Sequence, residues 1–199
     1  MTAMINRHLS EEQMNTISDA VKNILTALGD DPSREGLVET PMRVARMYDE
    51  VFEGMRYTNE EIAAMFGKCF TDVNSSDMVV VKDISVFSHC EHHIALMYNM
   101  KVSVAYLPKD KVIGLSKIAR IADMVCKRLQ LQERITSDIA QILTIALDTQ
   151  DVMVIVSGEH SCMTARGIEK PGTITVTRTA LGAFKENPDL RSEALKAFN

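Results

Sequence analysis

The chain has 199 residues, of which 46% are hydrophobic and 25% charged, and its formal net charge is -5. This composition is typical of a globular protein with one sizeable core, and it excludes disordered and fibrous classes. The acidic balance argues against broad nucleic-acid binding, and no apolar run approaches the length that spans a membrane. We therefore expect a cytoplasmic protein with reduced cysteines that binds neither nucleic acid nor membranes.

The first 70 residues predict a helical region. Ser10 and Gln13 have the spacing of a capping box, and apolar residues follow at helical intervals. Pro41 stands where the first position of another helix is expected. The expected helices run from Ser10 to about Gly29, from Thr40 to about Gly54 and from Asn59 to about Phe66.

After residue 70 the pattern changes to strands and helices in the order β, β, α, α, β, β. The expected strands cover 78–87, 100–107, 151–157 and 173–181, the expected helices begin at Ser116 and at about Gln132, and a short helix begins near 187. This order predicts an α+β domain over 71–199, with helices on one face of an antiparallel sheet. The helical region over 1–70 would be an extension of that domain.

A cluster of cysteine and histidine follows the first expected strand. Cys90 and His93 are three positions apart, and Cys162 follows a later strand with His160 two residues before it. A zinc ion held by Cys90, His93 and Cys162 would keep a fourth position for water, which is typical of catalytic sites. Short clusters of these residue types also arise by chance, so the residues alone leave an ordinary loop as the alternative.

Several familiar motifs are absent from the sequence. It has no HExxH, no CxxC and no HxE followed by PCxxC, which argues against zincins, zinc ribbons and the usual nucleobase deaminases. The segment GIEKPGT at 167–173 has the glycine spacing of a P-loop but lacks its lysine. A nucleotide-binding site in this chain would therefore not be a P-loop.

Four segments carry a resemblance to a known family. SHCEHH, VAYLPKDKVIGLSKIARI, QLQERIT and GEHSCMTARGI resemble zinc-dependent GTP cyclohydrolase I, in this order and at compatible spacings. The similarity extends from Asp31 to about Phe184, and ETPMRVARMY fits the family's entry helix. The resemblance implies the tunnelling fold, in which subunits close their sheets into a barrel only by oligomerisation, here a homodecamer of two facing pentamers.

The resemblance also implies a reaction. GTP and water would give 7,8-dihydroneopterin triphosphate and formate, the first step of folate or other pterin biosynthesis. Zinc held by Cys90, His93 and Cys162 would activate the water that attacks C8 of the purine. His160 would protonate N7, and His92 would assist the later proton transfers, because imidazole exchanges protons near neutral pH.

The substrate contacts are likewise implied by the resemblance. Glu133 would accept hydrogen bonds from guanine, and Ser116 would contact the ribose region. The triphosphate would meet positive charge from Lys117, Arg120, Arg166, Arg43 and Arg46. Without the resemblance, such arginines are more often solvated helix faces, and Glu133 is a first-turn glutamate favoured by the helix dipole.

Two other functions compete with this one. The first is a zinc-stabilised oligomer that binds a guanine nucleotide for regulation. The second is a tunnelling-fold enzyme in which Cys90 or Cys162 is a covalent nucleophile and His92 its base. The joint presence of His92, His160 and Glu133 favours the cyclohydrolase, whereas His89 and Arg178 receive no role.

Overall fold

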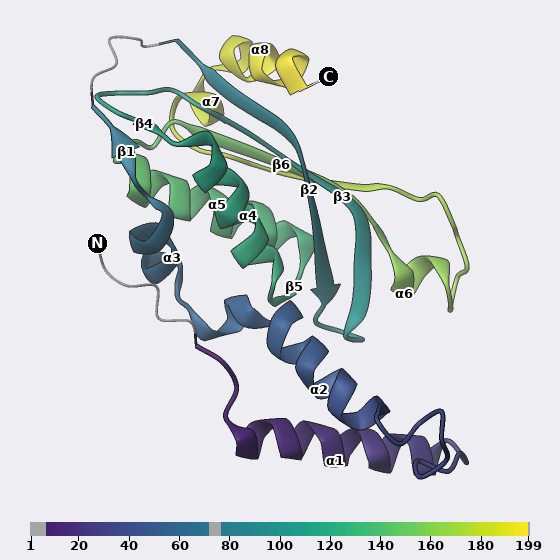
Figure 1. The fold of residues 1–199 in the computed structure, drawn as a ribbon. Coiled ribbons are helices and arrows are strands. Elements are labelled where there is room, and N and C mark those ends of the chain that lie inside the picture. The colour runs from purple at the N-terminus through teal and green to yellow at the C-terminus, as the bar shows by residue number, and fades with distance from the viewer. Residues whose placement is uncertain (1–6, 72–76, 199) are drawn as a thin grey trace.

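The computed structural model describes residues 7–71 and 77–198 (Figure 1). The helices are α1 Glu11–Ala27, α2 Thr40–Val51, the 3-10 helix η1 Glu53–Arg56, α3 Asn59–Phe66, α4 Leu115–Cys126, α5 Gln132–Leu147, α6 Ser161–Thr164, α7 Ala183–Glu186 and α8 Pro188–Phe198. The strands are β1 Cys69–Phe70, β2 Val79–Cys90, β3 Ala95–Tyr106, β4 Val112–Ile113, β5 Leu129–Gln130, β6 Val152–His160 and β7 Thr175–Ala180. Within the described ranges, no helix is long and apolar enough to cross a membrane.

The main sheet has five strands in the order β5-β2-β3-β6-β7. The pairs β2·β3, β3·β6 and β6·β7 are antiparallel, and the short β5 pairs with β2 in parallel. Strands β1 and β4 form a separate two-stranded sheet. The four long strands and the two helices between them confirm the expected α+β arrangement.

One face of the sheet packs on α4 and α5, which lie against it in Figure 1. Val104 of β3 and Val154 of β6 point into this layer and are fully buried together with Ile121 and Ile139. Successive strand residues face opposite sides, so the same alternation places their neighbours on the other face. The main hydrophobic core therefore lies between the sheet and the helices α3, α4 and α5.

The other face is covered at one end by α7 and α8. Phe184 and Ala194 of these helices are fully buried in a second cluster with Ala105 of β3 and Met153 of β6. The expected one-face arrangement therefore holds for α4 and α5, the helices between the strands, whereas the C-terminal helices α7 and α8 pack on the opposite face. Strands covered on both sides carry apolar residues at consecutive positions, and β3 and β6 do so near this end.

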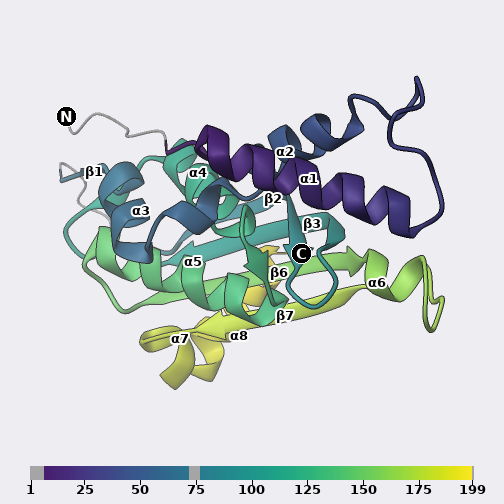
Figure 2. The same cartoon turned by 90° about the horizontal axis from the view of Figure 1, so that it is seen from below.

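The first two helices lie side by side away from the sheet (Figures 1 and 2). The capping box of α1 is confirmed, since the Gln13 backbone N–H donates to Ser10 Oγ at 3.2 Å and the Ser10 N–H donates to Gln13 Oε1 at 2.9 Å. Ile24 and Leu28 nevertheless remain 56% and 78% exposed in the single chain. Helix α3, by contrast, joins the main core, so a domain boundary at residue 70 stays a prediction.

Several element boundaries differ from expectation. Strand β2 continues to Cys90 and β6 to His160, so both strands include polar residues that periodicity had left in loops. Helix α4 begins at Leu115, with Gly114 at its N-cap, one residue before Ser116. A strand continues through polar residues when a neighbouring strand supplies hydrogen-bond partners for its backbone N–H and C=O groups. Local hydropathy does not indicate where this happens.

Candidate functional site

The strand register brings two distant sequence segments to one end of the sheet. Met97 of β3 pairs with Ser88 of β2 on one side and with His160 of β6 on the other. The loop after β2 and the short helix α6 after β6 therefore lie side by side. Ser161 strengthens this contact, because its hydroxyl donates to the Leu96 carbonyl at 2.7 Å.

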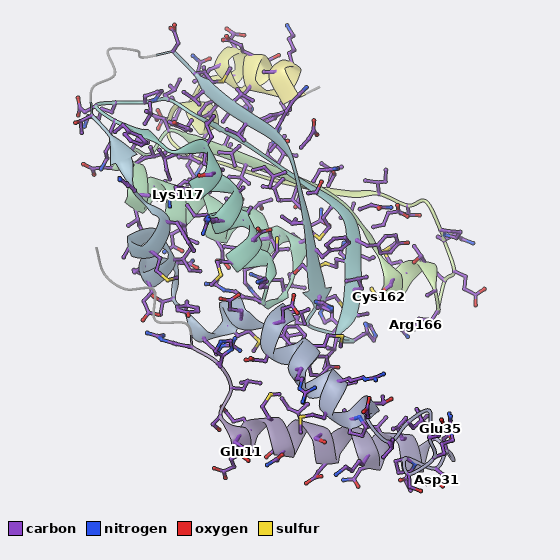
Figure 3. The ribbon with its side chains drawn as sticks, viewed as in Figure 1. Glu11, Asp31, Glu35, Lys117, Cys162 and Arg166 are labelled. Atoms are coloured by element: carbon purple, nitrogen blue, oxygen red, sulfur yellow. The ribbon has the colours of Figure 1, made fainter. Side chains whose placement is uncertain are left out.

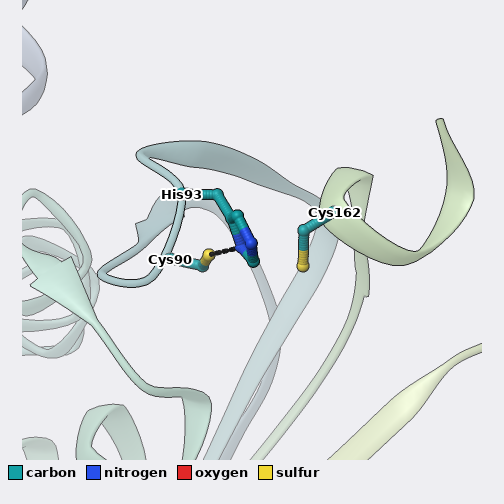
Figure 4. Close-up of side chains that lie close together, drawn as sticks. All are labelled: Cys90, His93 and Cys162. Carbon is teal, nitrogen blue, oxygen red and sulfur yellow. Dashed lines mark hydrogen bonds between the residues drawn. The ribbon is translucent and has the colours of Figure 1, made fainter. Parts of the chain in front are cut away.

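Cys90, His93 and Cys162 meet at this end of the sheet (Figure 4). One potential ligand atom from each side chain lies within 4.8 Å of the other two. The Sγ of Cys90 is 3.9 Å from Nδ1 of His93. Cys90 is buried and His93 exposed, so the group opens to solvent on the histidine side. The expected ligand trio is thus assembled within a single chain.

The donor atoms of this group suit a zinc ion. Burial raises the pKa of the Cys162 thiol above its ordinary value of 9.0, and the neighbouring Cys90 thiol adds to the shift. Two adjacent thiolates and a neutral imidazole are disfavoured next to each other unless a cation balances them. Two sulfurs and one nitrogen are ligands that zinc prefers, and three protein ligands leave one position open.

Positive charge borders Cys90, His93 and Cys162, which are called the metal-binding group below because their donor atoms could hold a metal ion. The Arg166 guanidinium hydrogen-bonds to Nε2 of His93, and Figure 3 shows Arg166 beside Cys162. His92 is exposed on the same loop, with its ring centroid 6.3 Å from that of His93. The structure therefore gathers Arg166 and His92 with the ligand trio, as expected.

His160 is the last residue of β6, and its side chain lies against the first turn of α5. Its Nε2 lies 2.8 Å from Oε1 of Gln132. Burial lowers the pKa of the His160 imidazole below its ordinary value of 6.5, and the negative charge of Glu133 partly opposes that shift. Glu133 is therefore close enough to influence His160 and is itself exposed. His160 is two residues before Cys162, so His160 and Glu133 lie near the metal-binding group.

The other expected substrate residues lie elsewhere in the chain. Ser116, Lys117 and Arg120 belong to the first half of α4, and Figure 3 shows Lys117 well away from Cys162. On α2, Arg43 pairs with Glu39. Arg46, on the same helix, lines a hollow together with His8, Asp49, Glu50, Glu53 and Arg56. Within the described ranges, none of these five residues has a hydrogen bond or ion pair to Cys90, His93 or Cys162.

Sequence reasoning missed the role of Gln132. Its side chain is 2% exposed although glutamine is ordinarily a surface residue. Its position in the helical repeat could have indicated burial, because Gln132 lies on the same buried face of α5 as Ile135 and Ile139. A polar residue on such a face needs hydrogen-bond partners inside the protein.

The sequence analysis also did not predict an ion pair between Arg134 and Glu91, which holds the loop at 91–94 in place. Arg134 of α5 donates to the Glu91 carboxylate at 2.7 Å and 3.3 Å. The Glu91 backbone N–H donates to the Gln130 carbonyl at 3.1 Å. Strand β5 and the first turn of α5 thus support the loop that carries His92 and His93.

His89, which received no role in the sequence analysis, packs against the residue that follows α2. Its ring meets Phe52 edge to face with 5.1 Å between centroids. Burial lowers the pKa of this histidine below its ordinary 6.5. His89 therefore joins β2 to the segment that follows α2, a packing role.

Comparison with known proteins gives a consistent result. The family model described as GTP cyclohydrolase I matches residues 17–199. The chain is 58% identical over 190 residues to GTP cyclohydrolase 1 of Clostridium botulinum (strain Langeland), covering 93% of this chain and 97% of that protein. It is 59% identical over 184 residues to GTP cyclohydrolase 1 of Clostridium beijerinckii, covering 90% and 93%. With a match over nearly its whole length, the chain belongs to the GTP cyclohydrolase I family.

Proposed function

We propose that this protein hydrolyses GTP to formate and 7,8-dihydroneopterin triphosphate, using zinc held by Cys90, His93 and Cys162. The observation that carries the proposal is the convergence of these three donors beside His160 and Glu133 in a chain of this family. The product would supply folate or another pterin-derived pathway. All four cysteines are free thiols, which suits a reducing compartment, so we propose a cytoplasmic location.

The protein's own residues position and protonate the purine. When bound, zinc supplies a Lewis acid that makes a coordinated water nucleophilic near neutral pH. His160 transfers a proton to N7 of the purine, which makes C8 more electrophilic. His92, exposed on the neighbouring loop, exchanges protons with the imidazole ring of the substrate as that ring opens.

Glu133 would recognise the guanine edge. Its two carboxylate oxygens match the ring N–H and the exocyclic amine, two adjacent donors that adenine does not present. Glu133 lies one residue after Gln132, which contacts His160, so the base edge and the reacting ring would be held by neighbouring residues of α5. This arrangement would couple recognition of guanine to proton transfer.

We further propose that the triphosphate site is completed by other subunits of a homo-oligomer, a decamer of two pentamers. Figure 3 shows Lys117 of α4 well away from Cys162, so we infer that Ser116, Lys117 and Arg120 of that helix serve the metal-binding group of a neighbouring copy. The sheet supports this, because β7 is an edge strand whose Val176 is 63% exposed. An exposed apolar edge favours pairing with another chain, as closure of a barrel requires.

The competing functions explain less of the geometry. A nucleotide-binding regulator would not need a half-buried histidine held by Gln132 two residues before Cys162. A covalent cysteine mechanism needs a thiolate, whereas burial raises the pKa of Cys162 and leaves Cys90 only 4% exposed. Both observations favour the cysteines as metal ligands.

The proposal is tested by incubating the purified protein with GTP and, in parallel, with ATP. Formate and a pterin absorbance should appear together from GTP and not from ATP. Release of phosphate without formate, or no turnover by the zinc-loaded protein, would contradict the proposed reaction.

A further inference from the structure

The side chain of Gln132 is held in one orientation by two strands. Its Nε2 donates to the Val156 carbonyl of β6 at 3.0 Å and to the Thr175 carbonyl beside it on β7 at 2.9 Å. Both amide hydrogens are therefore used. Turning the amide over would place its oxygen against two carbonyl oxygens in a buried site, which is costly.

This fixed orientation determines the role of Oε1. The oxygen faces Nε2 of His160 at 2.8 Å and can only accept a hydrogen bond. The ring nitrogen opposite it must therefore carry the hydrogen. In a neutral imidazole the other nitrogen, Nδ1, then has the free lone pair.

We propose that Gln132 is a positioning residue that holds His160 as the Nε2–H tautomer, so that Nδ1 is the atom that exchanges a proton with the purine. The proposal rests on the proposed function of His160. To act as the donor, the ring first takes up a proton at Nδ1 and becomes the imidazolium. When Nδ1 passes that proton to N7, the ring returns to the neutral form with its hydrogen on Nε2, still bonded to Gln132. The same contact fixes the plane of the ring against β6 and β7.

The tautomer can be observed without any turnover. Solid-state ¹⁵N NMR of the sedimented zinc-loaded protein, labelled at histidine, separates protonated from unprotonated ring nitrogens, and a His160→Ala sample identifies the His160 signals. We expect a protonated Nε2 and an unprotonated Nδ1 at a mildly alkaline pH. A protonated Nδ1 in the wild-type protein would overturn the proposal, and this result requires no Gln132 variant to fold.

Kinetics give the second readout. Gln132→Met should lower kcat for formate release roughly 10- to 100-fold, the usual range for loss of a residue that orients a functional histidine, with little change in KM for GTP. Thr179→Val is the matched control, because it removes a 2.9 Å hydrogen bond to Thr136 that joins the same helix α5 to β7. It should leave kcat unchanged.

The outcomes separate the two proposals. A wild-type protein that releases no formate contradicts the proposed function, whatever its tautomer. An active wild-type protein overturns the role of Gln132 if Gln132→Met keeps full kcat, or if only KM rises. An equal loss of kcat in Thr179→Val would reassign the effect to the junction of α5 and β7.

Discussion

Met97 on β3 lies directly opposite His160 on β6 in the sheet register. Because Met97 also pairs with Ser88 of β2, this one position of β3 aligns β2, which ends at Cys90, with β6, which leads into Cys162. Met97 is itself fully buried. The candidate site therefore depends on strand register, and a shift of one residue would turn these side chains to the other face of the sheet.

Replacing His160 should separate chemistry from metal binding. His160→Ala removes the proposed proton donor without removing a ligand, so we expect formate release to fall roughly 10²- to 10⁴-fold. Zinc content, measured by atomic absorption, should remain at the wild-type level. Cys162→Ala is the control that should lose both zinc and activity. Loss of zinc from His160→Ala would contradict the assigned role.

Glu133 is tested by a change of charge at constant size. Glu133→Gln replaces a charge-assisted acceptor by an amide, whose loss is worth about 1.5–3 kcal/mol, so GTP should bind roughly tenfold or more weakly. Calorimetric titration with GTP measures this directly. Glu193→Gln, an exposed change on α8, should leave affinity unchanged. Equal affinity in Glu133→Gln would remove this residue from the guanine site.

The shared triphosphate site predicts complementation between inactive variants. Lys117→Ala and His160→Ala each damage a different subunit's contribution, so mixed oligomers should contain some intact sites and regain activity. A mixture of His92→Ala with His160→Ala should stay inactive, because both residues belong to the same chain's site. Assays after joint unfolding and reassembly provide the comparison. Failure of the first mixture to recover would contradict a site shared between subunits.

The attachment of the N-terminal segment should depend on pH. The Arg7 guanidinium donates to Glu61 at 2.6 Å and holds the pKa of that carboxyl below its ordinary 4.5. A carboxyl whose folded pKa is lowered adds stability above its unfolded pKa, and that stability is lost as pH falls through the folded value. Wild type should therefore be more stable than Arg7→Gln at neutral pH.

Urea unfolding followed by circular dichroism checks this dependence. The stability difference between wild type and Arg7→Gln should shrink steadily as the pH falls below 4.5. Lys22→Gln is a suitable control, because Lys22 forms an ion pair with Asp19 within one exposed helix. A difference between wild type and Arg7→Gln that does not change with pH would show that the ion pair is not its source.

Local sequence patterns predicted the helices and strands well. The helix expected from Asn59 to about Phe66 is confirmed as α3, and in the structure Thr58 and Glu61 form a capping box at its start. The trio Cys90, His93 and Cys162 was also predicted, since ligand chemistry restricts which residues can meet at zinc. In both cases the information lies in residue type and short spacing.

What the sequence did not predict depends on contacts between distant segments. The burial of Phe184 against Ala105 and Met153 results from packing on the second face of the sheet, which helical periodicity does not specify. The bonds of Gln132 to two strand carbonyls require the register of β6 and β7. Local patterns specify which side chains a helix buries, whereas register and topology determine what they meet.

The most direct test of the account is formate release from GTP before chelation, after chelation and after zinc is returned, with zinc content measured in each sample. The account predicts that formate and pterin appear together, disappear when the metal is removed and return with zinc. It also predicts that Cys162→Ala is not restored by zinc. Full turnover in the metal-free protein would contradict a zinc centre formed by Cys90, His93 and Cys162.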